Sequence, residues 1–186
     1  MTARDGRIVF DGPGDVWIFA YGSLMWDPGF EHVEVRPARL GGYHRAFCVR
    51  SEVYRGTPDR PGLTLGLDRG GSCRGLAFRV AERDRDAAAR YLEQRELVED
   101  IYFCRRVKLT SAGGRFDAYA FIVNRAHPIY APKQPLDDMA RIIAGASGKV
   151  GPNRAYLENT VAHLDTLGIA DGPLHELLRR VKRIAD

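Results

Sequence analysis

The sequence predicts an α+β fold: a mixed, curved β-sheet that closes into a small barrel, with flanking helices and a helical C-terminal part. Strand-like segments fill most of the first two-thirds of the 186 residues, and helix-like segments fill the end. A single helix-like segment interrupts the strands, so the chain lacks the regular alternation of a parallel α/β sheet. We expect one domain over residues 16–186, preceded by a loose polar extension over residues 1–15.

The first expected strand, residues 16–20, is an apolar run with β-branched and aromatic residues, which suits burial on both faces. It ends abruptly at Tyr21-Gly22-Ser23-Leu24. Glycine lets a ligand approach the main chain closely, and consecutive N–H groups in such a turn can hold a carboxylate or phosphate. Two interpretations are open from these residues alone: an anion-binding cradle, or a tight turn beside a buried strand.

Six further strands are expected at residues 33–39, 42–49, 63–67, 72–80, 101–109 and 116–123. Gly41-Gly42 separates the first two, and the turn sequence at residues 68–71 separates the next two. Residues 111–114 join the last two strands. Between the second and third strands, residues 54–62 form a loop rich in Pro and Gly that is too polar for the core.

Four helices are expected. The first covers residues 82–98, where the apolar residues change to a helical spacing. The second covers residues 139–146 and starts at Asp137 or Asp138, and the third is capped by Asn153 and ends at Gly168. For the last helix, which runs to residue 184, Asp171 followed by Pro173 gives a cap and a first turn.

One carboxylate in the first expected helix lies on the wrong face. Glu96 is four residues beyond Leu92 and seven beyond Ala89, inside the apolar stripe. A buried carboxyl group either keeps its proton or finds a partner, and burial raises its pKa toward the range useful for proton transfer. The alternatives are that the helix ends earlier and exposes Glu96, or that Glu96 forms a structural ion pair with Arg95, Arg105 or Arg106.

Composition excludes several other classes of protein. The net charge of +4 comes from arginines scattered among acids, without an aromatic RNA-binding signature or zinc-finger spacing, so we expect no nucleic-acid partner. No apolar run approaches the ~20 residues that span a bilayer, so we expect no membrane partner. The five histidines show no metal-ligand spacing, and no bound metal is expected. An odd, scattered set of three cysteines indicates a reducing compartment, hence a cytoplasmic protein.

A set of short motifs in a fixed order resembles one family, the ChaC-like γ-glutamylcyclotransferases. The motifs are Tyr21-Gly22-Ser23-Leu24, Arg45-Ala46-Phe47, Gly56-Thr57-Pro58 with Pro61-Gly62, Tyr91-Leu92-Glu93-Gln94-Arg95-Glu96, Tyr130-Ala131-Pro132, Pro135-Leu136, and Gly148 with Gly151-Pro152-Asn153-Arg154-Ala155-Tyr156-Leu157. The ordered set is far more specific than any one motif. The resemblance implies a mixed β-barrel with flanking helices, in agreement with the α+β prediction.

The resemblance also implies a function. Members of the family cleave glutathione to 5-oxoproline and cysteinylglycine and need no metal or organic cofactor. The substrate-binding turn falls on Ala20, Tyr21, Gly22, Ser23, Leu24 and Met25, the catalytic acid/base falls on Glu96, and Tyr130 is implied as a pocket residue. Residues 97–102, which include the further acid Glu99, replace a glycine-containing turn that some members have there.

Two rival functions are open. One is the same chemistry on other γ-glutamyl amino acids or γ-glutamylamines, with loop 54–62 as the candidate element that closes over the leaving group and distinguishes substrates. The other is a non-catalytic protein that binds γ-glutamyl metabolites through the turn. A carboxylate left without a partner on the apolar face argues against a mere binder, because such a protein gains little from it.

Overall fold

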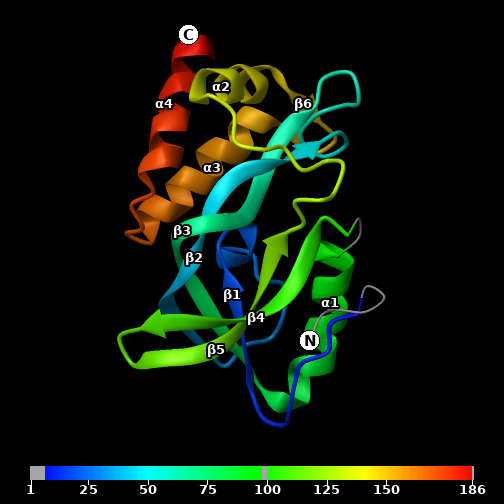
Figure 1. Cartoon of the computed structure of the whole chain (residues 1–186), viewed down its shortest axis with the longest axis vertical. Helices are drawn as coiled ribbons and strands as arrows, with labels where there is room; N and C mark the ends of the chain where they lie inside the picture. The colour runs from blue at the N-terminus through cyan, green and yellow to red at the C-terminus, as the bar shows by residue number, and fades with distance from the viewer. Residues whose placement is uncertain (1–6, 98–99, 186) are drawn as a thin grey trace. The chain divides into compact units, whose positions relative to one another are not determined.

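Within the described residues, five strands close into one barrel in the order β1-β3-β2-β4-β5 (Figure 1). The strands are β1 (Val16–Ala20), β2 (Glu34–Ser51), β3 (Gly62–Val80), β4 (Tyr102–Ser111) and β5 (Gly114–Val123). β1 runs antiparallel to β3 and parallel to β5, where Ile18 pairs with Tyr119. β4 is antiparallel to both β2 and β5. The predicted α+β class and the closed mixed sheet are confirmed.

The computed structural model describes residues 7–97 and 100–185. The chain divides into two compact units. The first unit comprises Met1–Arg45 and Gly66–His127, and the second comprises Ala46–Leu65 and Pro128–Asp186. The long strands β2 and β3 contribute residues to both units.

The prediction of separate short strands was wrong at two places. Except for Val33, the predicted strands 33–39 and 42–49 lie in the single strand β2, and residues 63–67 and 72–80 lie in the single strand β3. The glycines that indicated turns instead lie within the strands, with positive φ at Gly42 (82°), Gly70 (102°) and Gly71 (66°). A glycine in such a conformation lets a strand bulge and bend without ending it.

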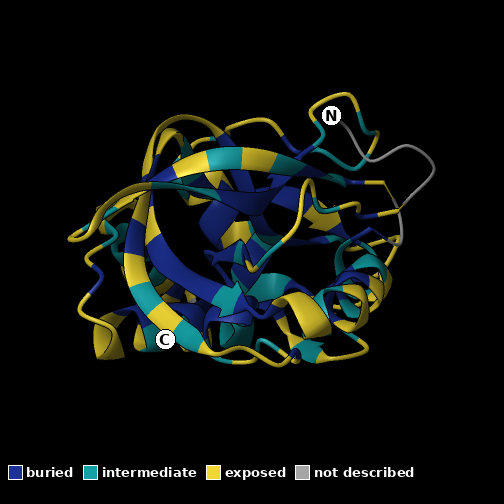
Figure 2. Cartoon of the chain, turned by 90° about the horizontal axis from the view of Figure 1, so that it is seen from below, coloured by how far each residue is buried: buried dark blue, intermediate teal, exposed yellow. Residues whose placement is uncertain are grey.

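The barrel encloses the core of the first unit. Its side chains come from all five strands and from Tyr21, just after β1: Phe19, Tyr21, Ala38, Leu40, Leu67, Cys73, Ala77, Leu109, Ala118, Ala120 and Ile122. In Figure 2 buried residues gather on the strands, although exposed residues alternate with them along parts of the strands and also lie on the helices and loops. Burial of a large apolar side chain contributes roughly 2 kcal/mol, so the large members of this cluster stabilise the first unit.

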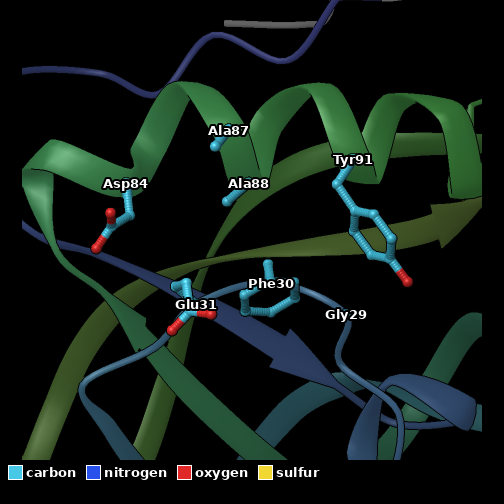
Figure 3. Close-up of a pocket in the computed structure, with 7 residues that line it drawn as sticks. All are labelled: Gly29, Phe30, Glu31, Asp84, Ala87, Ala88 and Tyr91. Atoms are coloured by element: carbon cyan, nitrogen blue, oxygen red, sulfur yellow. The ribbon is translucent and has the colours of Figure 1, made fainter.

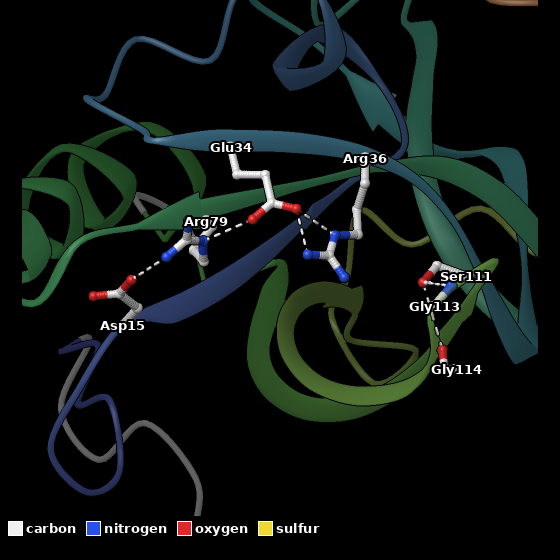
Figure 4. Close-up of polar contacts among 7 residues, drawn as sticks. All are labelled: Asp15, Glu34, Arg36, Arg79, Ser111, Gly113 and Gly114. Atoms are coloured by element: carbon white, nitrogen blue, oxygen red, sulfur yellow. Dashed lines mark hydrogen bonds and ion pairs between the residues drawn. The ribbon is translucent and has the colours of Figure 1, made fainter.

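Outside the barrel, a chain of charges joins the beginnings of β1 and β2 to the end of β3 (Figure 4). Asp15 accepts a bond from Arg79 at 2.6 Å, and Arg79 also donates to Glu34 at 2.9 Å. Glu34 in turn accepts hydrogen bonds from Arg36, whose guanidinium lies 4.3 Å from the centre of the Trp17 ring. These side chains are about one-third exposed, and ion pairs that water reaches contribute little to the free energy of unfolding. The network therefore serves mainly to align the three strands.

The N-terminal segment is less loose than predicted. Residues 7–15, here called the N-terminal strap, contact the first unit closely, with Ile8 buried. The Phe10 ring lies edge-on to the Tyr119 ring at 4.8 Å. Arg85 donates hydrogen bonds to three strap carbonyls, those of Phe10 (2.8 Å), Gly12 (2.7 Å) and Gly14 (3.0 Å). The short apolar run Ile8-Val9-Phe10 was the sequence signal for this packing, which the prediction of a loose extension overlooked.

The predicted helix over residues 82–98 begins as a 3-10 turn, η2 (Glu82–Asp84), and continues as α1 (Arg85–Glu96). Val98 lies outside the described residues, as does Glu99. Ala88, Ala89 and Leu92 are buried along one face, as the spacing predicts.

Three helices pack against one another in the second unit: α2 (Leu136–Gly145), α3 (Asn153–Thr166) and α4 (Gly172–Ala185). The short strands β6 (Ser147–Gly148) and β7 (Gly151–Pro152) pair between α2 and α3. The cap predicted at Asp171 is confirmed, since its carboxylate accepts the Leu174 N–H at 3.3 Å. None of the described helices is long and apolar enough to cross a membrane.

The cap predicted at Asn153 was wrong. Asn153 is the first residue of α3, the cap position is Pro152, and the Asn153 side chain bonds to the main chain of Leu63 instead. The start predicted at Asp137 or Asp138 was also displaced, because α2 begins at Leu136 and holds both acids in its first turn. Carboxylates in a first turn are favoured by the helix dipole. The two aspartates therefore did indicate the start of a helix, although the predicted first residue was wrong.

Candidate active site

The predicted substrate-binding turn lies where β1 ends. Ser23–Met25 forms the short 3-10 turn η1, in which the Met25 N–H donates to the Gly22 carbonyl at 2.9 Å. The side chains of Tyr21, Leu24 and Met25 are buried and anchor the turn to the core. Among the described residues, the N–H groups of Gly22, Ser23 and Leu24 have no acceptor. They are therefore available to a ligand oxygen.

A buried arginine fixes the first residue of this turn. Arg45, on β2, is 4% exposed, and its guanidinium donates to the carbonyl oxygens of Tyr21 and Arg74, the latter at 2.7 Å. Burial of a cation is unfavourable unless its N–H groups find acceptors. Two main-chain carbonyls supply them here, so the turn and the arginine hold each other in place.

Glu96 is the last residue of α1, one turn beyond the fully buried Leu92. Its side chain is 16% exposed, and Oε1 lies 3.3 Å from Nε of Arg95. Burial raises the pKa of Glu96 above the ordinary value of a glutamate, and the neighbouring Arg95 guanidinium opposes this shift without cancelling it. Glu96 is thus a shielded carboxyl group whose proton affinity is increased, as proton transfer near neutral pH requires.

The ion pair that the sequence left open is formed with Arg95. The two other candidates have different neighbours: Arg106 donates to Asp117 at 2.8 Å, and Arg105 lies over the Phe103 ring at 5.1 Å. Glu96 is therefore not without a partner, and the argument that an unpaired acid excludes a binding protein loses its force. The raised pKa persists despite the pair.

Arg95 also contacts the predicted turn. Its Nη2 donates to the Ser23 hydroxyl oxygen at 2.8 Å, across 72 positions of sequence. Its Nη1 donates to the Tyr91 hydroxyl at 2.7 Å and to the Asp27 carbonyl at 2.8 Å. One guanidinium therefore brings the turn and Glu96 into a single polar cluster. The sequence indicated both ends of this cluster, but not the connection between them.

Comparison with known proteins identifies the family of the chain. The family described as ChaC-like protein matches residues 16–184, which is nearly the whole chain. The chain belongs to the ChaC-like family. This confirms the family predicted from the sequence motifs, and with it an enzyme of the γ-glutamylcyclotransferase class.

Relatives of this ChaC-like chain include proteins named as γ-glutamylcyclotransferases. The glutathione-specific γ-glutamylcyclotransferase of Escherichia coli strain K12 is 39% identical over 172 residues, covering 92% of this chain and 74% of that protein. γ-Glutamylcyclotransferase 2-3 of Arabidopsis thaliana is 34% identical over 178 residues, covering 91% and 89% respectively. The crystal structure of a γ-glutamylcyclotransferase specific to glutathione from yeast has a TM-score of 0.82 at 20% identity, covering 91% of this chain and 96% of that one, which supports the fold.

A groove of about 380 Å³ lies between α1 and residues 29–31 of this ChaC-like chain (Figure 3). Its wall includes Tyr91, whose hydroxyl accepts the Arg95 bond, and Phe30, whose ring lies 6.5 Å from the Tyr91 ring. Gly29 lies so close to Tyr91 that a Cβ there would overlap the ring. No predicted site residue lines this groove, so the groove is not the predicted site. It is connected to the Arg95 cluster through Tyr91, which belongs to both.

Tyr130 belongs to the second unit. It pairs with Val49 in an isolated antiparallel bridge and lines a cavity of about 270 Å³. The rest of that wall is mostly apolar, with Pro61 and Leu63 at the end of loop 54–62. The role of Tyr130 as a pocket residue for the γ-glutamyl substrate stays a prediction, as does the role of the loop.

The residues of the described chain offer no group of three or more His, Cys, Asp and Glu side chains that could hold a metal ion. The cluster in the first unit brings together a shielded carboxyl group, a guanidinium, a serine hydroxyl and the main-chain N–H groups of a turn. This set suits proton transfer beside a bound anion.

Proposed function

We propose that the protein cleaves glutathione by intramolecular cyclotransfer, releasing 5-oxoproline and cysteinylglycine. In this proposal Glu96 is the proton acceptor and donor, and the turn at Tyr21–Leu24 binds the γ-glutamyl group. The observation that carries the proposal is the cluster in which Ser23 and Glu96 share one guanidinium, that of Arg95. Family membership and the names of the relatives support the substrate.

The γ-glutamyl group contains its own nucleophile. Its α-amine attacks the γ-carbonyl carbon, a C–N bond forms to close a five-membered ring, and the amide C–N bond to cysteinylglycine breaks. Because both reacting groups belong to one molecule, the enzyme needs chiefly to hold the substrate in the folded conformer. The products retain all the atoms of glutathione, and no water or oxidant is consumed.

Two proton transfers accompany the ring closure. The attacking amine loses a proton, and the departing amine gains one. A single carboxyl group near both nitrogens serves each in turn, first as base and then as acid. The burial that raises the pKa of Glu96 supports this role, because a carboxylate with an ordinary pKa is too weak a base to keep the proton it must return.

The turn is suited to the other requirement, which is to hold the anionic parts of the substrate. The N–H groups of Gly22, Ser23 and Leu24 are available to the α-carboxylate or to the oxygen of the tetrahedral intermediate. Removal of one such donor typically lowers kcat by about 10²-fold or more. The resemblance to the family further assigns Tyr130 to the pocket.

The test is to incubate purified protein with reduced glutathione and to quantify 5-oxoproline and cysteinylglycine. We expect equimolar products from the wild type, and loss of turnover by at least about 10³-fold in Glu96→Gln with substrate binding retained. Glu93→Gln is the matched control, since it makes the same change one turn earlier on α1 and keeps an oxygen able to accept the Ile8 N–H.

Each other outcome has a definite meaning. A Glu96→Gln enzyme within tenfold of the wild type would refute the role of Glu96 while leaving the reaction intact. Product from γ-glutamyl amino acids or γ-glutamylamines, but not from glutathione, would support the same chemistry with another leaving group. Binding of glutathione without any product would favour the non-catalytic binding protein.

A further inference from the structure

The side chain of Arg95 is held by four partners. Its guanidinium donates to Ser23 Oγ (2.8 Å), to the Tyr91 hydroxyl (2.7 Å) and to the Asp27 carbonyl (2.8 Å), and Nε lies 3.3 Å from Glu96 Oε1. The side chain is 21% exposed. A planar guanidinium with contacts on three of its edges has a defined orientation, which the single ammonium group of lysine would not have.

The contact with Arg95 decides what the Ser23 hydroxyl can do. A hydroxyl has one hydrogen to donate and lone pairs that accept. Because Ser23 Oγ accepts from a cation, its own hydrogen turns away from Arg95 and is directed to another acceptor. No described residue accepts it. Together with the N–H groups of Gly22, Ser23 and Leu24, this hydroxyl hydrogen gives the turn several donors, which suits an anionic oxygen of a ligand.

The contact with Glu96 has a different effect. Among the described residues, Arg95 is the one charged group that perturbs this carboxyl group, and it favours the ionised form against the effect of burial. Without Arg95, Glu96 would hold its proton to a higher pH. The carboxylate would then be available as a base over a narrower range of pH. The same side chain thus acts on both ends of the cluster.

We propose that Arg95 is a positioning residue that directs the Ser23 hydroxyl toward an anionic oxygen of the substrate and keeps the Glu96 carboxylate ready to accept a proton. This proposal rests on the proposed function, and goes beyond it by assigning the residue that couples substrate binding to the acid/base. Arg95 itself contacts neither the reacting carbonyl nor the amine in this assignment.

The experiment is a double-mutant cycle with a pH profile. Wild type, Arg95→Gln, Ser23→Ala and the double variant are assayed for release of 5-oxoproline over a range of glutathione concentrations between about pH 5.5 and 9. We expect Arg95→Gln to raise KM by about tenfold, the size of one lost hydrogen bond to an anion. We also expect the acidic limb of its kcat profile to move to higher pH, because the pKa of Glu96 rises when the cation is removed.

The cycle separates positioning from general damage. Ser23→Ala should raise KM in the wild-type background but have little further effect once Arg95 is absent, because the hydroxyl then has no fixed orientation. The matched control is Arg90→Gln, an exposed arginine on the same helix, which should leave KM and the pH profile unchanged. Arg95→Lys should keep the acidic limb of the wild-type pH profile, because lysine retains the positive charge. It should not keep the wild-type KM, because lysine lacks the planar set of N–H donors that arginine has.

The remaining outcomes contradict one proposal or the other. Additive effects of Ser23→Ala and Arg95→Gln with an unshifted acidic limb would overturn the role of Arg95. If Arg95→Gln fails to fold by circular dichroism, the same cycle with Arg95→Lys decides the question. A wild type that releases no 5-oxoproline would overturn the proposed function, and this proposal with it, whereas an active wild type with an unaffected Arg95→Gln overturns this proposal alone.

Discussion

Asn153 forms two hydrogen bonds with the main chain of Leu63: its side-chain oxygen accepts the Leu63 N–H and its amide nitrogen donates to the Leu63 carbonyl, each at 2.7 Å. The residue is fully buried at the start of α3, and Leu63 lies at the start of β3. The Asn153 side chain makes the two hydrogen bonds that a neighbouring strand would otherwise make to Leu63. It thereby satisfies the N–H and the carbonyl of Leu63, which water does not reach.

Asn153→Ala is therefore expected to destabilise the second unit by about 3 kcal/mol, because it leaves two buried main-chain groups without partners. Asn153→Asp should be nearly as harmful, since a carboxylate has no hydrogen to donate to the Leu63 carbonyl. Urea titration of each variant gives the free energy of unfolding that checks these two expectations. Asn159→Ala, at an exposed position of the same helix, should change it by less than about 0.5 kcal/mol. A stable Asn153→Ala would contradict this account.

The N-terminal strap should depend on Arg85. Replacement by Gln removes three hydrogen bonds from a guanidinium to strap carbonyls, and we expect a loss of about 1–2 kcal/mol in local stability. Hydrogen exchange is the direct measurement: the amides of Ile8, Asp11 and Gly14 should exchange faster in Arg85→Gln. Arg83→Gln is the control, because the Arg83 side chain is 79% exposed. Equal exchange in the two variants would show that the strap does not need Arg85.

The raised pKa of Glu96 makes a prediction about stability and pH. The folded protein holds this proton more tightly than the unfolded chain does, so the contribution of Glu96 to stability is greatest below the ordinary glutamate pKa and is lost as the pH rises through the raised value. Gln does not titrate. The Tm of Glu96→Gln relative to the wild type should therefore increase from about pH 4.5 toward neutrality and then level off. A Tm difference that is independent of pH would contradict the assigned direction.

The cysteines should be unreactive in the folded protein. Cys48, Cys73 and Cys104 are all buried and form no disulfide, and burial raises the pKa of Cys104 to about 12. Since the thiolate is the reactive form, an aromatic disulfide reagent at pH 8 should label none of them within minutes and all three after denaturation. Denatured Cys104→Ser should bind one equivalent of reagent fewer than the denatured wild type, which identifies the signal of the Cys104 thiol. Rapid labelling of native Cys104 would show that its surroundings open readily.

Local patterns were sufficient for much of this protein. The apolar run before Tyr21, the helical spacing that places Glu96 beside Leu92, and the strong cap at Asp171 each involve residues a few positions apart. Their consequences, a strand, a helix face and a helix start, are governed by backbone geometry and short-range hydrogen bonds. The motifs also identified the ChaC-like family, because several short patterns in a fixed order are specific even where each alone is not.

Contacts between distant residues were decided only by the tertiary structure. Gly42 and Gly70 are typical of turns, yet the pairing of whole strands keeps them within β2 and β3, where the hydrogen bonds of the barrel outweigh local preference. Asn153 is typical of a helix cap, but a buried main-chain pair at Leu63 uses its side chain instead.

The same distinction holds for the site. The sequence by itself determined the ChaC-like family and placed a carboxyl group on an apolar face, and it predicted a turn that binds an anion. It left open which arginine would meet Glu96. Only the folded chain places one guanidinium against both Glu96 and Ser23, because that choice depends on how the end of α1 lies beside the end of β1 in the first unit, and no local pattern encodes a contact across 72 positions.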